Sequence, residues 1–229
     1  MLGSTLVAVL ALALQTGTVA GTVTLDGTRP QRGKEDPNEE CKCLHKDTGV
    51  IPGEREIVNK DMRIQNVFVW VSKGWEGRKY PIPDRPALLD QVGCLYRPRV
   101  QGIRAGQLLL IRNSDPVGHN VKSDPVRNPP GFNPLQPKGA EDFKVTFQNP
   151  EMAIQIGCNI HNWMRAYVHV MAHPYFATTD KDGAFTLPPL PTGSHEVSAW
   201  HEIYGELRPK PVTVKEGETA KLEFVFEKK

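Results

Sequence analysis

Short runs of β-branched and aromatic residues, separated by glycine and proline, recur along the whole chain. The 229 residues include 20 Gly and 20 Pro. Glycine accepts backbone conformations that tight turns require, and proline interrupts helices and central strands. The frequent Gly and Pro residues between these runs therefore predict many short strands joined by turns, and not long helices. We expect an all-β fold, in a chain long enough for one large domain or two small ones.

The first 20 residues have a different composition from the rest of the chain. An apolar run from Leu6 to Leu14 is followed by small residues that end at Ala20. This pattern predicts a signal peptide over 1–20, cleaved near Ala20, and therefore a periplasmic or secreted protein. The run is shorter than the about 20 apolar residues that span a bilayer. No later segment is long enough, so we expect no transmembrane segment in the mature chain.

Four cysteines, at positions 41, 43, 94 and 158, must be interpreted for an exported chain, in which disulfides can form. Cys41 and Cys43 are separated by one residue, a spacing that bridges poorly for geometric reasons. One disulfide is therefore expected between Cys94 and either Cys41 or Cys43, with Cys158 kept as a thiolate. Residues 28–55, which are polar and poor in large apolar groups, are expected to form a loop held by these cysteines.

The segment Cys158-Asn159-Ile160-His161-Asn162-Trp163-Met164 carries three potential metal ligands within seven residues. A strand that ends at Cys158, a tight turn at His161 and a strand that starts near Met164 would bring the three together. A blue-copper site needs one thiolate, two imidazoles and a weak axial thioether. The missing imidazole can come from His119, which lies upstream where a loop leads into a strand.

This Cys-x-x-His-x-x-Met spacing resembles the short ligand loop of the cupredoxins, amicyanin in particular, and His119-Asn120-Val121 matches their upstream ligand motif. The resemblance covers about 85–173. It implies a Greek-key β-sandwich that holds one type 1 copper ion. The implied ligands are His119, Cys158, His161 and Met164, and Asn120 is the implied neighbour that steadies the thiolate and its loop. Electrons would leave through the exposed edge of His161, beside Trp163, to a redox protein partner.

The C-terminal part has a second recognisable pattern. Thr179-Asp180-Lys181-Asp182-Gly183, a short strand and Leu190-Pro191-Thr192-Gly193 resemble the carboxypeptidase regulatory-like module, a transthyretin-like β-sandwich. The first two strands of that module have their matches far upstream, at Gly21–Leu25 and Asn66–Val71. We therefore predict one sandwich made of 21–80 and 175–229, with the copper domain, 85–173, inserted between them. The combination is similar to bacterial proteins labelled methylamine-utilisation-like.

Several residues allow a simpler interpretation. Cys158 could instead pair with Cys94, and Met164 on its own would be read as core filling. Cys41-x-Cys43-x-His45 looks like a metal clip but has no fourth ligand. His169 alternates with valines on a predicted strand and is expected to be packed or exposed, and not a ligand.

The sequence also bears on what the protein is not expected to do. With 28 Lys+Arg against 26 Asp+Glu, the chain has no strongly basic face for nucleic acid. It has no Gly-x-Ser-x-Gly, His-Glu-x-x-His or phosphate-binding glycine loop, and no paired histidine motifs for further copper sites, so we expect no enzyme. The expected function is single-electron transfer. The alternatives are copper storage or delivery, and a cell-surface module that binds carbohydrate or protein beside an incidental copper site.

Overall fold

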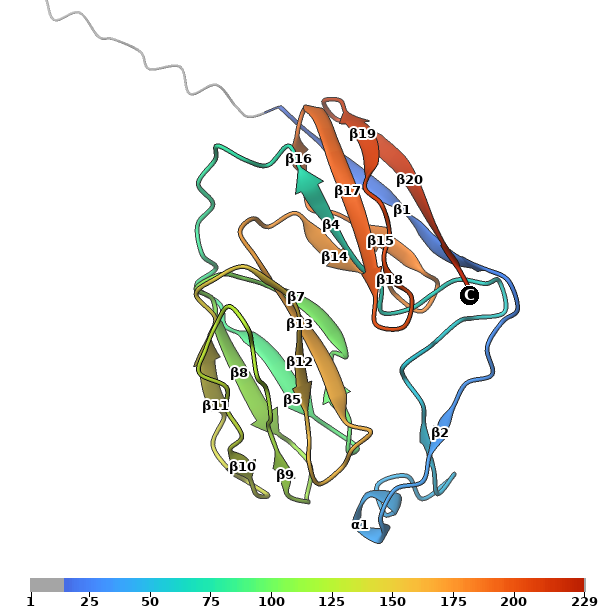
Figure 1. Cartoon of the computed structure of the whole chain (residues 1–229), viewed down its shortest axis with the longest axis vertical. Helices are drawn as coiled ribbons and strands as arrows, with labels where there is room; N and C mark the ends of the chain where they lie inside the picture. The colour runs from blue at the N-terminus through green and yellow to red at the C-terminus, as the bar shows by residue number, and fades with distance from the viewer. Residues whose placement is uncertain (1–14, 229) are drawn as a thin grey trace, which may run out of the picture.

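The computed structural model describes residues 15–228, and in this part of the chain strands dominate. The strands form two lobes that lie end to end along the long axis of the molecule (Figure 1). Each lobe has a hydrophobic core of its own. The predicted all-β class is confirmed.

The first lobe, which we call the N/C lobe, combines strands from both ends of the chain. They are β1 (Thr16–Asp26), β4 (Phe68–Lys73), β14 (Phe176–Thr178), β15 (Ala184–Thr186), β16 (Leu190–Pro191), β17 (Gly193–His201), β18 (Gly205–Glu206), β19 (Lys210–Val214) and β20 (Thr219–Glu227). Strand β1 pairs with β15, β16 and β20, whereas β4 pairs with β14 and β17. Strands within 16–26, 68–73 and 176–227 therefore share two sheets around one core.

The second lobe, which we call the middle lobe, is formed by the intervening residues. Its strands are β5 (Ala87–Gln91), β6 (Tyr96–Arg97), β7 (Val100–Arg104), β8 (Leu108–Asn113), β9 (His119–Asn120), β10 (Leu135–Gln136), β11 (Phe143–Thr146), β12 (Glu151–Gly157) and β13 (Arg165–Met171). They form a β11-β8-β5-β6 sheet, a β12-β13-β7 sheet and the short β10-β9 pair. The core between them includes Tyr96, Leu109 and Ile156.

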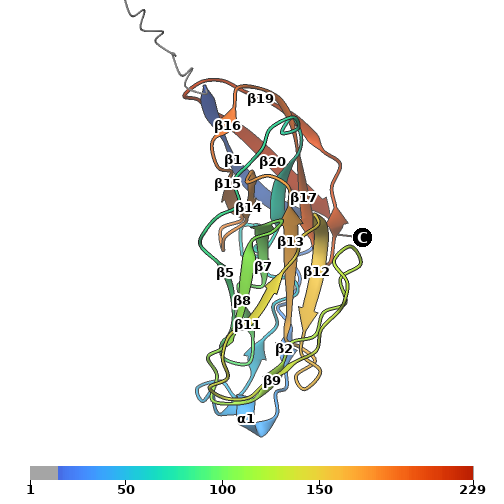
Figure 2. The same cartoon turned by 90° about the vertical axis from the view of Figure 1, so that its left-hand side faces the viewer.

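A third segment, residues 28–55, leaves the N/C lobe and returns to it; we call it the cap. It contains β2 (Lys34–Glu35), the single-turn helix α1 (Glu39–Lys42) and β3 (Ile51–Pro52). Both views place α1 at the far end of the middle lobe, where β9 also lies (Figures 1 and 2). Asn38 caps the start of the helix, since its Oδ1 accepts a hydrogen bond from the Cys41 N–H at 3.1 Å. The cap is therefore more structured than the loop predicted for it.

The two lobes meet along β4, which explains an unusual feature of its sequence. All four residues from Phe68 to Val71 are buried, although a strand with one solvent face should alternate. Val69 and Val71 face the N/C lobe core. Phe68 and Trp70 face the other way, toward Val100 of the middle lobe and its neighbours. The continuous apolar run is therefore the sequence pattern of a strand that is buried on both faces.

Strand β1 corrects the predicted boundary at Ala20. The strand starts at Thr16, Val19 is fully buried, and Thr18 is paired in parallel with Thr219 of β20. Cleavage at Ala20 would remove the first five residues of a core strand, so a boundary there does not agree with this fold. Residues 1–14 of the predicted signal peptide lie outside the described residues. Within 15–228, no helix has the length and hydropathy of a membrane span.

Candidate metal centre

The candidate metal ligands gather at the end of the middle lobe that the cap covers. His119 opens β9, and the other three lie in the turn between β12 and β13. That turn is closed by two backbone hydrogen bonds, from Met164 N–H to the His161 carbonyl (2.9 Å) and from Cys158 N–H to the Met164 carbonyl (3.2 Å). A seven-residue turn closed in this way brings side chains that are near in sequence around one point.

The geometry brings three donor atoms together. One ligand atom each from His119, Cys158 and His161 lies within 4.8 Å of the other two. The Nδ1 atoms of the two histidines are 2.9 Å apart, and Cys158 Sγ lies 3.9 Å from His161 Nδ1. All three residues are buried, and so is Met164 at the end of the turn. One thiol sulfur and two imidazole nitrogens form a donor set that suits copper.

Hydrogen bonds to the Cys158 sulfur stabilise its thiolate form. The backbone N–H groups of His161 and Asn120 point at Sγ, at 3.4 and 3.5 Å. Burial opposes ionisation of the thiol, but the hydrogen bonds from His119, His161 and these N–H groups outweigh it and lower the pKa of Cys158 to about 5. The sulfur is therefore held as a nucleophilic, metal-binding thiolate at neutral pH.

Asn120 joins β9 to the ligand turn. Its Oδ1 accepts hydrogen bonds from the N–H groups of Asn159 (2.7 Å) and Ile160 (3.4 Å), and it lies 3.2 Å from Cys158 Sγ. Its amide donates to Asn133 Oδ1. These contacts are those of a residue that fixes the turn relative to the His119 strand.

Asp115 also belongs to the candidate centre, although no sequence motif indicated it. One of its carboxylate oxygens lies 2.9 Å from His119 Nε2, on the side of the ring away from the other donors. The carboxylate also accepts the N–H groups of Gly93 (2.6 Å) and Cys94 (2.8 Å). Burial alone would raise the pKa of Asp115, but these bonds lower it. The bond to Asp115 orients the ring so that Nδ1 faces Cys158 and His161.

The only available signal for Asp115 was its position four residues before His119 in a loop. The pKa of His119 is raised: burial opposes the charged form, but the bonds to Asp115 and Cys158 favour it. Asn113 shapes this loop by donating its side-chain amide to the Val117 carbonyl at 2.8 Å. No spacing rule links the carboxylate to the ring, since the contact depends on how the loop folds.

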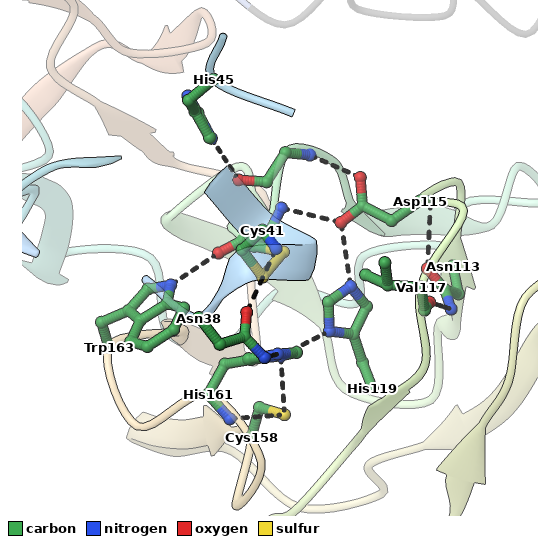
Figure 3. Close-up of a disulfide and its surroundings, with 12 residues drawn as sticks. Asn38, Cys41, His45, Asn113, Asp115, Val117, His119, Cys158, His161 and Trp163 are labelled. Carbon is green, nitrogen blue, oxygen red and sulfur yellow. Dashed lines mark hydrogen bonds and ion pairs between the residues drawn. A yellow bond between two sulfur atoms is a disulfide. The ribbon is translucent and has the colours of Figure 1, made fainter. Parts of the chain in front are cut away.

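The cap covers the centre, as Figure 3 shows. A disulfide joins Cys41 of α1 to Cys94, which decides between the two partners left open above, and Cys43 is free and exposed. Asn38 Nδ2 lies 3.3 Å from His161 Nε2. His161 is consequently only 1% exposed. The predicted surface edge of His161 is wrong, because a segment more than 100 residues away in sequence lies over it.

Trp163 lies beside the covered histidine and is half-buried. Its ring centroid is 5.2 Å from that of His161. Its indole N–H donates to the Cys94 carbonyl at 3.0 Å. The structure thus keeps Trp163 next to the candidate ligand and leaves the residue partly exposed.

The other histidine considered above, His169, is far from this cluster in the fold. It is fully buried between the lobes, where its ring stacks on Phe68 with centroids 4.0 Å apart. Its Nδ1 accepts the Ala153 N–H at 3.3 Å. Among the described residues it belongs to none of the groups with metal-binding geometry.

Comparison with known proteins gives similarity to solved structures only. No family model matches the chain, and no curated protein matches it. It is similar to a copper-containing nitrite reductase from Thermus scotoductus SA-01, with 25% identity, a TM-score of 0.35, and coverage of 42% of this chain and 24% of the reductase. It is similar to the oxidised state of an amicyanin mutant, with 21% identity, a TM-score of 0.35, and coverage of 39% of this chain and 86% of amicyanin.

A third similar structure is a purple cupredoxin from Nitrosopumilus maritimus, with 23% identity, a TM-score of 0.32, and coverage of 37% of this chain and 99% of that protein. One expectation is contradicted. We expected no enzyme, yet one similar structure is a nitrite reductase. The match spans about a quarter of the reductase. The activity of the reductase is therefore not shown for this chain.

Proposed function

We propose that this protein binds one copper ion through His119, Cys158 and His161, with Met164 as a weak fourth ligand, and transfers single electrons to or from a redox protein partner. The observation that carries the proposal is the meeting of one thiol sulfur and two imidazole nitrogens within 4.8 Å of one another in a buried site. Copper bound to such a set supplies reversible one-electron chemistry. The support for Met164 is its burial at the end of the same turn.

The residues around the centre would serve this function by holding its geometry constant. Asp115 orients His119, Asn120 holds the ligand turn, and the cap excludes water from His161. A rigid, dry site keeps the ligand positions similar in both oxidation states, so little reorganisation accompanies transfer. A storage or delivery protein would instead need an open, labile site, and the buried His161 argues against that alternative.

The route of the electron is part of the proposal. Because the cap covers His161, we assign the surface exit to Trp163, which adjoins the His161 ring and is partly exposed. Export to an oxidising compartment also remains a proposal. It is supported by the apolar N-terminal run and by the disulfide, since disulfides persist mainly outside the cytosol.

The N/C lobe remains a proposed regulatory-like module. The turn at 179–184 supports this proposal, since Asp180 accepts hydrogen bonds from Asp182 and Ala184 as a tight strand connection requires. No contact in the lobe, as far as residues 15–228 describe it, points to a particular carbohydrate or protein ligand.

The test of the copper site is the visible spectrum of the purified protein after addition of one equivalent of Cu(II). We expect an intense absorption from a copper–thiolate bond, and its complete loss in Cys158→Ser. Cys43→Ser is the matched control, because Cys43 is an exposed free thiol outside the centre, and it should keep the colour. A Cys158→Ser protein that retains the absorption would place the copper elsewhere.

A further inference from the structure

The Cys41–Cys94 disulfide lies directly against the metal centre. Both residues are fully buried. Their sulfur atoms and a ring nitrogen of His161 all lie within 4.8 Å of one another, and Cys94 is also grouped with Asp115 and His119 at the same range. A disulfide needed only to fasten the cap could lie anywhere along its contact with the middle lobe. This one adjoins both candidate ligand histidines (Figure 3).

His161 has a donor atom for each side. Its Nδ1 faces His119 and Cys158. Its Nε2 faces the cap, where the neighbouring group is the Asn38 amide at 3.3 Å. Two thiolates and one imidazole form a set of soft and borderline donors, which selects Cu(I) over harder cations. Cleavage of the sulfur–sulfur bond would therefore leave a compact ligand set beside the first centre.

We propose that reduction of the Cys41–Cys94 disulfide creates a second metal site, in which the two thiolates and His161 bind Cu(I). The site goes beyond the proposed electron transfer and shares only His161 with it. In this arrangement the redox state of the disulfide sets how many copper ions the protein holds. The chain would carry one ion when the disulfide is intact and two when it is open.

The reduction step requires a dithiol as the reductant. One of its thiolates attacks a disulfide sulfur, and the mixed disulfide is then resolved by the second thiol of the reductant. The dithiol becomes a disulfide, and Cys41 and Cys94 gain two electrons and two protons. Binding of Cu(I) then releases the two thiol protons. When the first copper ion already occupies His161 Nδ1, the Nε2 proton leaves as well, so that His161 bridges the two ions as an imidazolate.

Local opening of the α1 end of the cap would let a reductant reach the buried bond. The rest of the cap stays attached through Glu54, which pairs with Arg97 at 2.7 Å and lies 3.9 Å from Arg99. Its helix has a single turn, and β2 and β3 form a sheet of two-residue strands. Apart from the disulfide, its contacts near the centre include the bond between His45 Nε2 and the Gly93 carbonyl (2.8 Å) and the Asn38–His161 contact. Short elements of this kind can open locally while the rest of the protein stays folded.

The experiment is an anaerobic Cu(I) titration in competition with a chromophoric Cu(I) chelator. It compares the oxidised chain with the chain reduced by dithiothreitol and then desalted. We expect one tightly bound equivalent in the oxidised chain and two in the reduced chain. Cys158→Ser should lose one equivalent in each state, and the Cys41→Ser/Cys94→Ser double variant should bind one equivalent under both conditions. Cys43→Ser, the matched control, should behave as the wild type.

Three results would overturn the second site. The first is a reduced chain that binds no additional Cu(I). The second is an additional equivalent that survives in the double variant, because it would then reside on Cys43. The third is an additional equivalent that appears only with loss of the near-ultraviolet circular dichroism, because unfolded thiols would then be binding it. Failure of the first copper site is recognised separately, as the absence of binding in the oxidised chain.

X-ray absorption on reduced Cys158→Ser loaded with one Cu(I) supplies an independent readout. The second site predicts two sulfur neighbours for this ion. A spectrum with nitrogen neighbours alone would contradict the assignment of Cys41 and Cys94.

Discussion

At the scale of single residues, the orientation of His119 depends on a carboxylate outside the ligand set. Asp115 is buried, and its bond to Nε2 leaves Nδ1 facing the position proposed for the copper ion. Residues that orient a metal-binding histidine in this way contribute to affinity without touching the ion. The same carboxylate also binds two backbone N–H groups, so its position is fixed before the metal arrives.

We expect Asp115→Asn to weaken copper binding by about 10- to 100-fold while the copper–thiolate absorption persists at saturation. The measurement is a copper titration of both proteins under identical conditions. Asp142→Asn is the control, because Asp142 pairs with Arg112 at the surface, away from the centre. Equal affinities for the Asp115 variant and the wild type would show that the ring is oriented by packing alone.

Buried histidines make the metal-free protein sensitive to acid. Burial lowers the pKa of His169 to about 3, and burial, followed by the charge of Arg104 or Arg99, lowers those of His173 and His201 to about 4. Between these values and about 6.5, the unfolded chain binds protons that the folded chain does not. Stability therefore falls as the pH falls below about 6.5, by about 2 kcal/mol for each such histidine at pH 5.

His169→Gln tests the largest of these shifts. The variant should lose about 2 kcal/mol less than the wild type between pH 7 and pH 5, because one proton-binding group of the unfolded chain has been removed. Urea unfolding of the metal-free proteins at both pH values measures this difference. Identical pH dependence in the two proteins would mean that His169 is not held neutral in the folded state.

At the scale of elements, the cap is a short segment held by one covalent link. The Cys41–Cys94 disulfide joins residues 53 positions apart. A link of that length restricts the unfolded chain and contributes about 4 kcal/mol of stability in the chain-entropy model. The cap itself contributes few apolar side chains to the core, among them Ile51.

We accordingly expect the Cys41→Ser/Cys94→Ser double variant to be about 4 kcal/mol less stable than the oxidised wild type. Guanidinium unfolding of metal-free protein gives the free energies. Cys43→Ser should match the wild type, since that thiol is exposed and unpaired. A double variant as stable as the wild type would show that the link does not constrain the unfolded chain.

At the scale of the whole molecule, a buried ion pair joins the two lobes. Arg99 of the middle lobe donates two hydrogen bonds to Glu202 of the N/C lobe, at 2.5 and 2.8 Å, and each side chain is 3% exposed. The cap also contacts this ion pair, because Glu54 Oε2 lies 3.9 Å from Arg99 Nη1. All three parts of the protein thus meet at one guanidinium.

Glu202→Ala should destabilise the protein by about 3–5 kcal/mol, because it leaves the Arg99 charge buried with less compensation. The Arg99→Met/Glu202→Leu double variant should recover most of that loss, since it removes both charges and keeps the volume. Chemical unfolding of the two variants and the wild type makes the comparison. A double variant no more stable than Glu202→Ala would rule out the unpaired charge as the cause.

Local patterns predicted the all-β class, several of the strands and the turn that carries the candidate ligands. Strand β13 (Arg165–Met171) contains the alternation of His169 with valines that indicated a strand there, because side-chain alternation is a property of neighbouring residues. The turn from Cys158 to Met164 is equally local, since seven residues set which donors can converge. Strand β4 (Phe68–Lys73) overlaps the strand predicted over Asn66–Val71, although the sequence did not indicate its burial on both faces.

The remaining features depended on contacts between distant parts of the chain. Only the tertiary structure decided that Cys94 pairs with Cys41, that Asp115 meets His119, and that Asn38 covers His161. Likewise, the pairing of Thr18 with Thr219 extended β1 back beyond Ala20. The physical reason is the range of the interactions: residue type and spacing determine conformation over a few residues, whereas the path of the backbone determines which distant side chains become neighbours.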